Sequence, residues 1–177
     1  MDYTKRILLI IFLITALISC SGKDKSQPVK ANDTEFSSDS LTLADTGVEK
    51  FKGQVLYMPI YSNIPCKDKA FFDLSAFIAI HNTDMSHSIK VTKVFYFDNN
   101  GKLVKNFLDK EQILSPLSAT TFFVPKNDKS GTGANFIVEW ISDLPVTEPL
   151  IESVMVSCDT NYGISFLSMG KVIRTLK

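Results

Sequence analysis

The sequence has no excess of charge of either sign. Its 177 residues include 19 Lys and Arg and 19 Asp and Glu, so the formal net charge is zero. A nucleic-acid-binding protein needs a basic surface to replace the counterions along the phosphates, so we expect no nucleic-acid partner. Because 45% of the residues are apolar and 21% are charged, the composition is that of a globular chain rather than a disordered one.

Residues that carry catalysis are scarce. The two histidines, His81 and His87, lie within one short segment and leave little material for a Ser-His-Asp arrangement. No serine lies in a Gly-x-Ser-x-Gly motif, and no Cys-x-x-Cys motif supports thioredoxin-like redox chemistry. We therefore expect a protein that is not an enzyme, with no catalytic residues and no cofactor.

No apolar run is long enough for a transmembrane helix. Lys5 and Arg6 precede an apolar run of about twelve residues, whereas a helix needs roughly 20 to cross the hydrocarbon core. A basic start followed by a short apolar run is typical of an export signal. The run ends in Leu17-Ile18-Ser19-Cys20, which resembles the lipobox of bacterial lipoproteins. The alternative is an ordinary secretory signal that ends in a cysteine.

The lipobox resemblance implies that residues 1–19 are a signal peptide and that Cys20 carries acyl chains such as palmitate. The membrane is then a partner through Cys20, and three chains anchor firmly because one chain alone gives only marginal binding. In enteric-type sorting an aspartate after the cysteine indicates retention at the inner membrane, so Ser21 favours the outer membrane, facing the periplasm. We expect a protein of the bacterial cell envelope, with a second envelope protein as a candidate partner.

Residues 20–50 predict a flexible linker after the lipidated cysteine. Ten of the thirty residues from 21 to 50 are charged, five are serine, and Phe36 is the only aromatic residue. Such a stretch buries too little apolar surface to offset the entropy lost on ordering. Leu41 and Leu43 alternate with polar residues, so an alternative is that this short part docks as an extra strand.

Residues 51–177 predict one all-β domain. Apolar residues recur at every second position, as at Phe136, Val138 and Trp140, which is the period of a β-strand. Asn99-Asn100-Gly101 between two such runs is a strong hairpin signal. Strand-like runs lie at about 54–62, 70–82, 88–98, 102–108, 117–125, 134–142, 149–158 and 163–175. We expect an antiparallel, immunoglobulin-like β-sandwich of seven to eight strands.

Several segments carry a resemblance to a known family. They are Val55–Ser62, Ile80–Asp84, Gly131–Trp140, Pro149–Glu152 and Gly163–Gly170. Together they resemble the bacterial family of domain of unknown function 3124, over about 51–173. That family has no assigned activity, so the resemblance implies domain limits and an envelope location rather than chemistry. This chain has His81 where the family usually has arginine.

Two cysteines remain once Cys20 is assigned to lipid. Cys66 and Cys158 form an even pair in a domain that we expect to be exported, which favours a disulfide. Such a bridge would close a loop of about 93 residues and stabilise the fold by roughly 4–5 kcal/mol in the chain-entropy model. The alternative is two separate thiols at strand ends.

A polar segment between two strand-like runs is the first candidate ligand or interaction site. It contains His81, Asn82, Asp84 and His87. Imidazole and carboxylate groups in one turn are ligands for zinc or copper. The alternative is a polar turn in which Asn82 and Asp84 hydrogen-bond the backbone. We expect no metal, since the arginine usual at position 81 in the resembled family cannot ligate one.

The glycine-rich segment Gly131–Asn135 is the second candidate. A glycine-rich segment of this kind, ending here in Asn135, could form a backbone nest that binds an anion. It lacks the lysine and the following helix of a nucleotide-binding loop. The alternative is a turn without a ligand.

Glu139 and Glu152 are the third candidate. Glu152 shares its parity with Leu150, Val154 and Val156, and Lys93 shares its parity with Ile89 and Val91. Charges among core positions are costly unless they are paired. We therefore predict that Lys93 pairs with Glu139 or Glu152, either as a structural ion pair or as an edge charge that blocks strand pairing.

The leading expectation for function is a lipid-tethered, non-enzymatic interaction module. Its edge strands could recruit an extended partner by strand addition. Four aromatic residues at edges and turns are candidates for an interface, namely Tyr57, Tyr61, Phe107 and Tyr162. The alternative is an envelope protein that binds a small ligand or a metal at the Ile80–His87 turn or the Gly131–Asn135 loop.

Overall fold

A computed structural model describes residues 47, 49–158 and 163–177. The predicted signal peptide, Cys20, most of the linker and Tyr162 lie outside the described residues. Among the residues described, no helix has the length and apolar character needed to cross a bilayer.

The described part of the chain forms twelve β-strands. They are β1 (Lys50–Pro59), β2 (Asn63–Lys67), β3 (Ala70–Asp73), β4 (Ser75–His81), β5 (Ile89–Phe97), β6 (Leu103–Asn106), β7 (Gln112–Leu114), β8 (Ala119–Val124), β9 (Asn135–Thr147), β10 (Leu150–Ser157), β11 (Ile164–Met169) and β12 (Lys171–Leu176). β-branched and aromatic residues at alternating positions favour this extended structure, because they pack well on a pleated surface.

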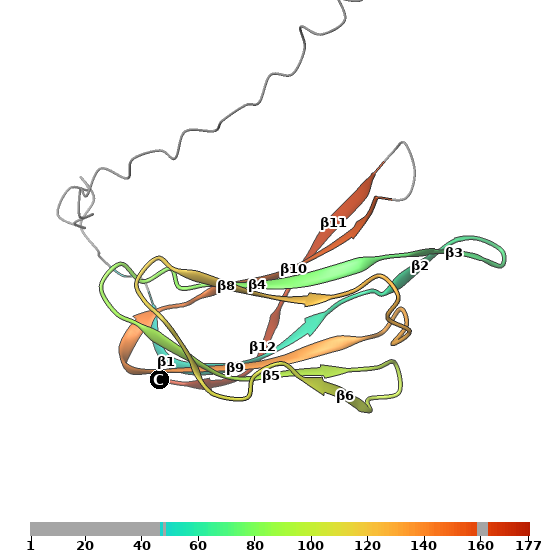
Figure 1. Cartoon of the computed structure of the whole chain (residues 1–177). Helices are drawn as coiled ribbons and strands as arrows, with labels where there is room; N and C mark the ends of the chain where they lie inside the picture. Colours follow the sequence, from blue (N-terminus) through green and yellow to red (C-terminus); the bar gives the residue numbers. More distant parts are fainter. Residues whose placement is uncertain (1–46, 48, 159–162) are drawn as a thin grey trace, which may run out of the picture. The chain divides into compact units, whose positions relative to one another are not determined.

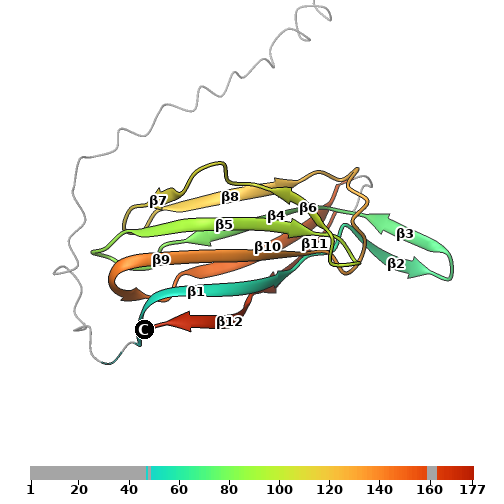
Figure 2. The ribbon, with the colours of Figure 1, turned by 90° about the horizontal axis from the view of Figure 1, so that it is seen from below.

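The strands form two large sheets and one separate hairpin. The six-stranded sheet has the order β12-β1-β9-β5-β6 with β7 also on β5, and the four-stranded sheet has the order β11-β10-β4-β8. Figures 1 and 2 show these sheets as two facing layers, with the β2–β3 hairpin extending beyond one end. Every strand pair found among the described residues is antiparallel. The predicted all-β antiparallel sandwich is therefore confirmed.

The number of strands exceeds the seven or eight predicted. The predicted run 70–82 breaks before Ser75 into β3 and β4, and β2 and β7 lie outside the predicted runs. The run 163–175 breaks at Gly170, where the chain leaves β11 in one sheet and enters β12 in the other. A Cβ at Gly170 would lie 2.9 Å from the Met58 side chain, so glycine lets the chain cross close to the core.

The core lies between the two large sheets. In β9 the alternation predicts the buried face correctly, because Phe136, Val138 and Trp140 are fully buried. The indole Nε1 of Trp140 donates a hydrogen bond to Gln54 Oε1 at 3.3 Å, so these two buried polar groups satisfy each other. In β4 every second residue likewise points into the core, where Ala76, Ile78 and Ile80 are fully buried.

In β5 the predicted parity is wrong after Val91. The pairing with β9 shifts between Val91 and Lys93, which is a β-bulge. One extra residue exchanges the two faces of a strand. The buried residues are therefore Ile89 and Val91, then Val94 and Tyr96, while Lys93 is exposed.

Candidate functional site

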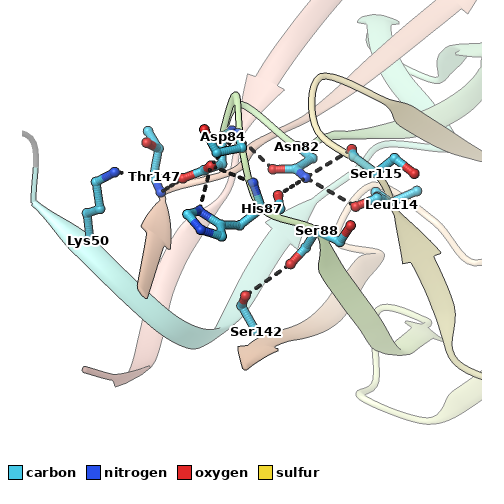
Figure 3. A network of polar contacts seen from close by, with 10 residues as sticks. Lys50, Asn82, Asp84, His87, Ser88, Leu114, Ser115, Ser142 and Thr147 are labelled. Carbon is cyan, nitrogen blue, oxygen red and sulfur yellow. Dashed lines mark hydrogen bonds and ion pairs between the residues drawn. The ribbon is translucent and has the colours of Figure 1, made fainter. Parts of the chain in front are cut away.

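The turn between β4 and β5 is built around a buried carboxylate. Asp84 is only 3% exposed, and its Oδ1 accepts the N–H groups of Ser86 and His87, each at 2.9 Å. Its Oδ2 accepts the N–H of Thr147, at the end of β9, at 2.9 Å. Figure 3 shows Asp84 between His87 of its own turn and Thr147 of β9. The carboxylate thus satisfies three backbone donors that would otherwise lack partners.

Lys50 and His87 flank the same carboxylate. The Lys50 ammonium lies 3.9 Å from Oδ2 of Asp84, and His87 Nδ1 lies 3.3 Å from Oδ1. Burial acts to raise the pKa of Asp84, but the three N–H donors and the Lys50 charge together outweigh it and hold the pKa below its ordinary value. Asp84 is therefore ionised near neutral pH.

Asn82 completes the turn from the other side. It is buried, and its amide Nδ2 donates to the carbonyl oxygens of His87 at 2.9 Å, Leu114 at 3.1 Å and Ser115 at 3.0 Å. Its Oδ1 accepts the N–H of Asp84 at 3.1 Å. The side chain therefore joins the β4–β5 turn to the segment after β7 (Figure 3). These contacts are those of the polar-turn alternative, in which Asn82 and Asp84 hydrogen-bond the backbone.

The two histidines of this segment do not converge on one point with Asp84. His81 lies at the end of β4, paired in register with Leu150 and Ala119, whereas His87 contacts Asp84. Among the residues that the structure describes, no three His, Cys, Asp or Glu side chains are grouped closely enough to hold a metal ion. The described turn thus offers a metal at most the Asp84–His87 pair, whose carboxylate already has backbone partners.

The Gly131–Asn135 loop also uses its donors within the protein. Gly131 donates its N–H to Ser62 Oγ at 2.8 Å, and Gly133 donates its N–H to Asn99 Oδ1. Gly131 has a φ of 96°, and a Cβ there would collide with the Asn99 side chain. Two of the N–H groups that an anion would need are thus occupied, which favours a turn without a ligand.

The neighbouring residues tie this loop to the core. Tyr96 is buried and donates its hydroxyl proton to Asp128 Oδ1 at 2.7 Å, and Asp128 also accepts the N–H of Ser130. Burial, together with the Asp128 carboxylate, raises the pKa of the Tyr96 phenol. Tyr96 therefore acts as a neutral structural donor.

Glu139 and Glu152 lie on opposite outer faces of the sandwich, which corrects the placement of Glu152 among core residues. Glu139 accepts a hydrogen bond from Thr92 Oγ1 at 2.6 Å and lies opposite Lys93 in the β5–β9 register. The ion pairs found among the described residues do not include one between Lys93 and either glutamate. The β5 bulge therefore moves Lys93 out of the core, which corrects its predicted placement, while the pairing of Lys93 with Glu139 stays a prediction that the strand register allows.

A shallow depression lies beside Glu139. It has a volume of about 210 Å³, and Gly53, Glu139 and Arg174 are among its lining residues. A Cβ at position 53 would lie 2.9 Å from the carbonyl oxygen of Trp140, so the bulged β1 needs glycine there. The depression is smaller than the roughly 300–1,000 Å³ of typical small-molecule sites.

The outer face of the four-stranded sheet is a different kind of surface, which we call the apolar face. Strand register puts Phe123 of β8 opposite Phe77 of β4, Phe77 opposite Val154 of β10, and Val154 opposite Leu167 of β11. An unbroken apolar row therefore crosses all four strands. The apolar face consists of Ser75, Phe77, Ala79, His81, Ala119, Thr121, Phe123, Leu150, Glu152, Val154, Val156, Ser165, Leu167 and Met169.

The side chains at the two edges of the apolar face are open to solvent. Phe123 is 57% exposed, Leu167 59% and Met169 54%. The face contains no Lys or Arg, and Glu152 is its single carboxylate. Contiguous apolar patches of this kind mark interaction sites on soluble domains.

Sequence reasoning missed the apolar face because β10 inverts the usual pattern. Its buried residues include Ser153 and Ser157, while Val154 and Val156 face outward. Ser153 can face the core because its hydroxyl donates to the carbonyl oxygen of Pro59 at 2.9 Å. The more apolar parity is thus the outer one, so Leu150, Glu152, Val154 and Val156 were assigned to the wrong side.

The remaining predicted positions are dispersed. Cys66 and Cys158 are both exposed free thiols in the structure, as in the alternative of two separate thiols. Tyr57 is partly exposed, whereas Tyr61 packs against Phe166 with ring centroids 6.0 Å apart. Phe107 packs on the core beside Tyr96, Phe122 and Phe136 and is not a free surface aromatic.

Comparison with known proteins identifies the family but no activity. Residues 53–173 match the model of the family described as protein of unknown function (DUF3124), and the chain belongs to that family. A search of the curated proteins found no match. A crystal structure of Thermotoga maritima 1070 is similar at 13% identity and a TM-score of 0.42, over 67% of this chain and 92% of its own.

Proposed function

We propose that this member of the DUF3124 family is a lipid-anchored protein of the bacterial cell envelope that acts as a non-enzymatic interaction module. The observation that carries the proposal is the apolar face, which leaves Phe123, Leu167 and Met169 each more than half exposed. Exposed apolar area costs free energy in water, at about 25 cal/mol for each Å². Covering it with a partner recovers that energy, which makes this face the part of the described surface best suited to binding.

The chemistry of the other candidate residues supports binding over catalysis. The carboxylate of Asp84 is held by three N–H groups, and the amide of Asn82 has four backbone partners. A catalytic base needs a free lone pair within reach of substrate. Both side chains instead hold the turn together, which is the work of a rigid scaffold.

The sequence at the start of the chain supports the envelope location. Lys5, Arg6, a short apolar run and the segment ending in Cys20 form the pattern of a lipoprotein signal. If residues 20–50 are the linker that their composition predicts, about thirty residues of random coil span on the order of 30 Å. The folded part would then work near a membrane surface, where its partner is also confined.

The proposal is tested by placing a photocrosslinking amino acid at Leu167 of the full chain in intact cells. We expect a discrete protein adduct at this position. The matched control is Ile113 in β7, which is 65% exposed but lies outside the apolar face. The absence of any adduct at Leu167, or equal adducts at Leu167 and Ile113, would contradict an interaction role for this face.

The anchoring part is tested separately. Metabolic labelling with palmitate should mark the wild-type chain and should not mark a Cys20→Ala variant. A Cys20→Ala variant that is labelled as strongly as the wild type would remove Cys20 as the lipid attachment site.

A further inference from the structure

We infer that the occupant of the apolar face is the same face of a second copy of this chain, so that the protein is a two-fold symmetric dimer. The inference rests on the proposed interaction function and names its partner. In such a dimer the outer faces of two four-stranded sheets stack on each other, as the inner faces do within a sandwich. A two-fold interface requires that one surface patch complement itself.

The charge pattern of the apolar face meets that requirement. Of its fourteen residues only Glu152 carries a full charge, and there is no Lys or Arg. A surface that binds anionic lipid headgroups or nucleic acid needs cations, which this face does not supply. A face without strong charge of either sign is instead complementary to a second apolar face, including its own copy.

The row across the strands shows where a second copy would remove most apolar area from water. Phe123 and Leu167 stand at the two edges, and Phe77 and Val154 lie half-buried between them. The edge side chains are the more exposed ones because no further strand of this sheet flanks them. Covering Phe123 and Leu167 therefore contributes most of the apolar burial in the dimer.

The size of the face also matches. Four strands spaced about 4.8 Å apart, each contributing roughly six residues of about 3.3 Å, give a flat footprint on the order of 400 Å². Side chains that stand off this footprint give it a larger accessible area, near the lower end of the roughly 600–1,000 Å² that each partner buries in a specific interface. The face thus has the size of a small specific dimer interface.

Anchoring on one membrane would favour the dimer further. Two copies held by their Cys20 lipids share a surface layer, which raises the effective concentration of each for the other.

The experiment co-expresses two full-length copies that carry different affinity tags. We expect the tags to co-purify after detergent extraction, and a Leu167→Asp substitution in both copies to reduce that co-purification at least tenfold. The matched control is Ile113→Asp, an equally exposed apolar residue on β7 that should have no effect. Co-purification caused by shared detergent micelles would persist equally in both variants, so a loss confined to Leu167→Asp cannot come from micelles.

Each remaining outcome overturns the dimer. If the two tags do not co-purify, the protein does not bind a second copy of itself. Co-purification that survives Leu167→Asp shows an interface elsewhere on the chain. A crosslinked adduct from Leu167 to a different protein rejects the second copy but leaves the interaction function standing, so the two proposals fail separately.

Discussion

The two outer faces of the sandwich cover one shared core but differ in chemistry. The six-stranded sheet presents charged residues outward around a short apolar row of Tyr57, Ile137 and Phe95. Lys90 and Asp143 pair there across β5 and β9 at 3.3 Å. The four-stranded sheet presents the apolar face, with Glu152 alone among its fourteen residues carrying a full charge. The charged residues of the first face include Lys90, Lys93, Glu139, Asp143, Lys171 and Arg174.

The difference in charged side chains indicates which of the two outer faces is suited to contact with water. Charged side chains on an exposed sheet keep a monomer soluble and block unwanted pairing. The apolar face lacks these side chains although it is just as open at its edges, where Phe123 and Leu167 are more than half exposed. One face therefore has the composition of a solvated surface, and the other is the face to which we propose that a partner binds.

The largest expected effect is on the fold that supports both faces. Asp84→Ala leaves the N–H groups of Ser86, His87 and Thr147 without their acceptor. We expect this to cost about 3 kcal/mol of unfolding free energy, because buried donors lose charge-assisted hydrogen bonds. Urea denaturation of the wild type and the variant measures the difference. A loss below about 0.5 kcal/mol would show that water replaces the carboxylate without cost.

The next-largest expected effect is on self-association, and it distinguishes the apolar face from the outer face of the six-stranded sheet. Phe123→Asp combined with Leu167→Asp should weaken self-association by roughly 100-fold, about 2.7 kcal/mol, because each removes an apolar contact and buries a charge. The two positions are three strands apart, so their effects should be nearly additive. Ile173→Asp on β12 is the control, since it is half exposed on the other sheet. Analytical ultracentrifugation should show monomers only for the double variant; equal weakening by Ile173→Asp would erase the distinction between the faces.

A smaller effect is expected on the pH dependence of the folding stability. The pKa of Asp84 is lower in the folded chain than its ordinary value, so its ionised form stabilises the fold. This stabilisation is complete above the unfolded pKa, about 3.9, and is lost as the pH falls through the lower folded pKa. Thermal unfolding at several acidic pH values should show a steeper loss of stability for wild type than for Asp84→Asn. Parallel curves would assign the acid sensitivity to other carboxyl groups.

The sequence allowed the sandwich and part of its core to be predicted, because the alternation in β9 sets Phe136, Val138 and Trp140 on the face opposite to Asn135 and Glu139. All three apolar residues are buried as that alternation predicts. The bulge of β5 between Val91 and Lys93 is not visible in the amino-acid sequence, so the predicted inward and outward positions are wrong after it. A bulge depends on pairing with a distant strand, which a local pattern does not contain.

The candidate sites were predictable to a similar degree. The turn with Asn82 and Asp84 was foreseen as one of two alternatives, because such side chains hydrogen-bond nearby backbone. The apolar face was not foreseen. An alternation of period two shows that a strand has two faces but does not show which face is inside. Ser153 faces the core, where its hydroxyl donates to the carbonyl oxygen of Pro59 in the other sheet. This contact depends on the tertiary structure, so the local sequence does not reveal it.

The smallest expected effect concerns the single charge on the apolar face. Glu152 lies opposite Ala79 and Met169, so a two-fold stack covers two carboxylates, one from each copy. Removing both charges by Glu152→Gln should strengthen self-association about threefold, because an ionised group loses more hydration on burial than an amide does. Glu139→Gln on the opposite face changes charge by the same amount and should leave association unchanged. If Glu152→Gln instead weakens association, the carboxylate has a partner in the second copy, and His81 at the adjacent position of β4 is then the first residue to substitute.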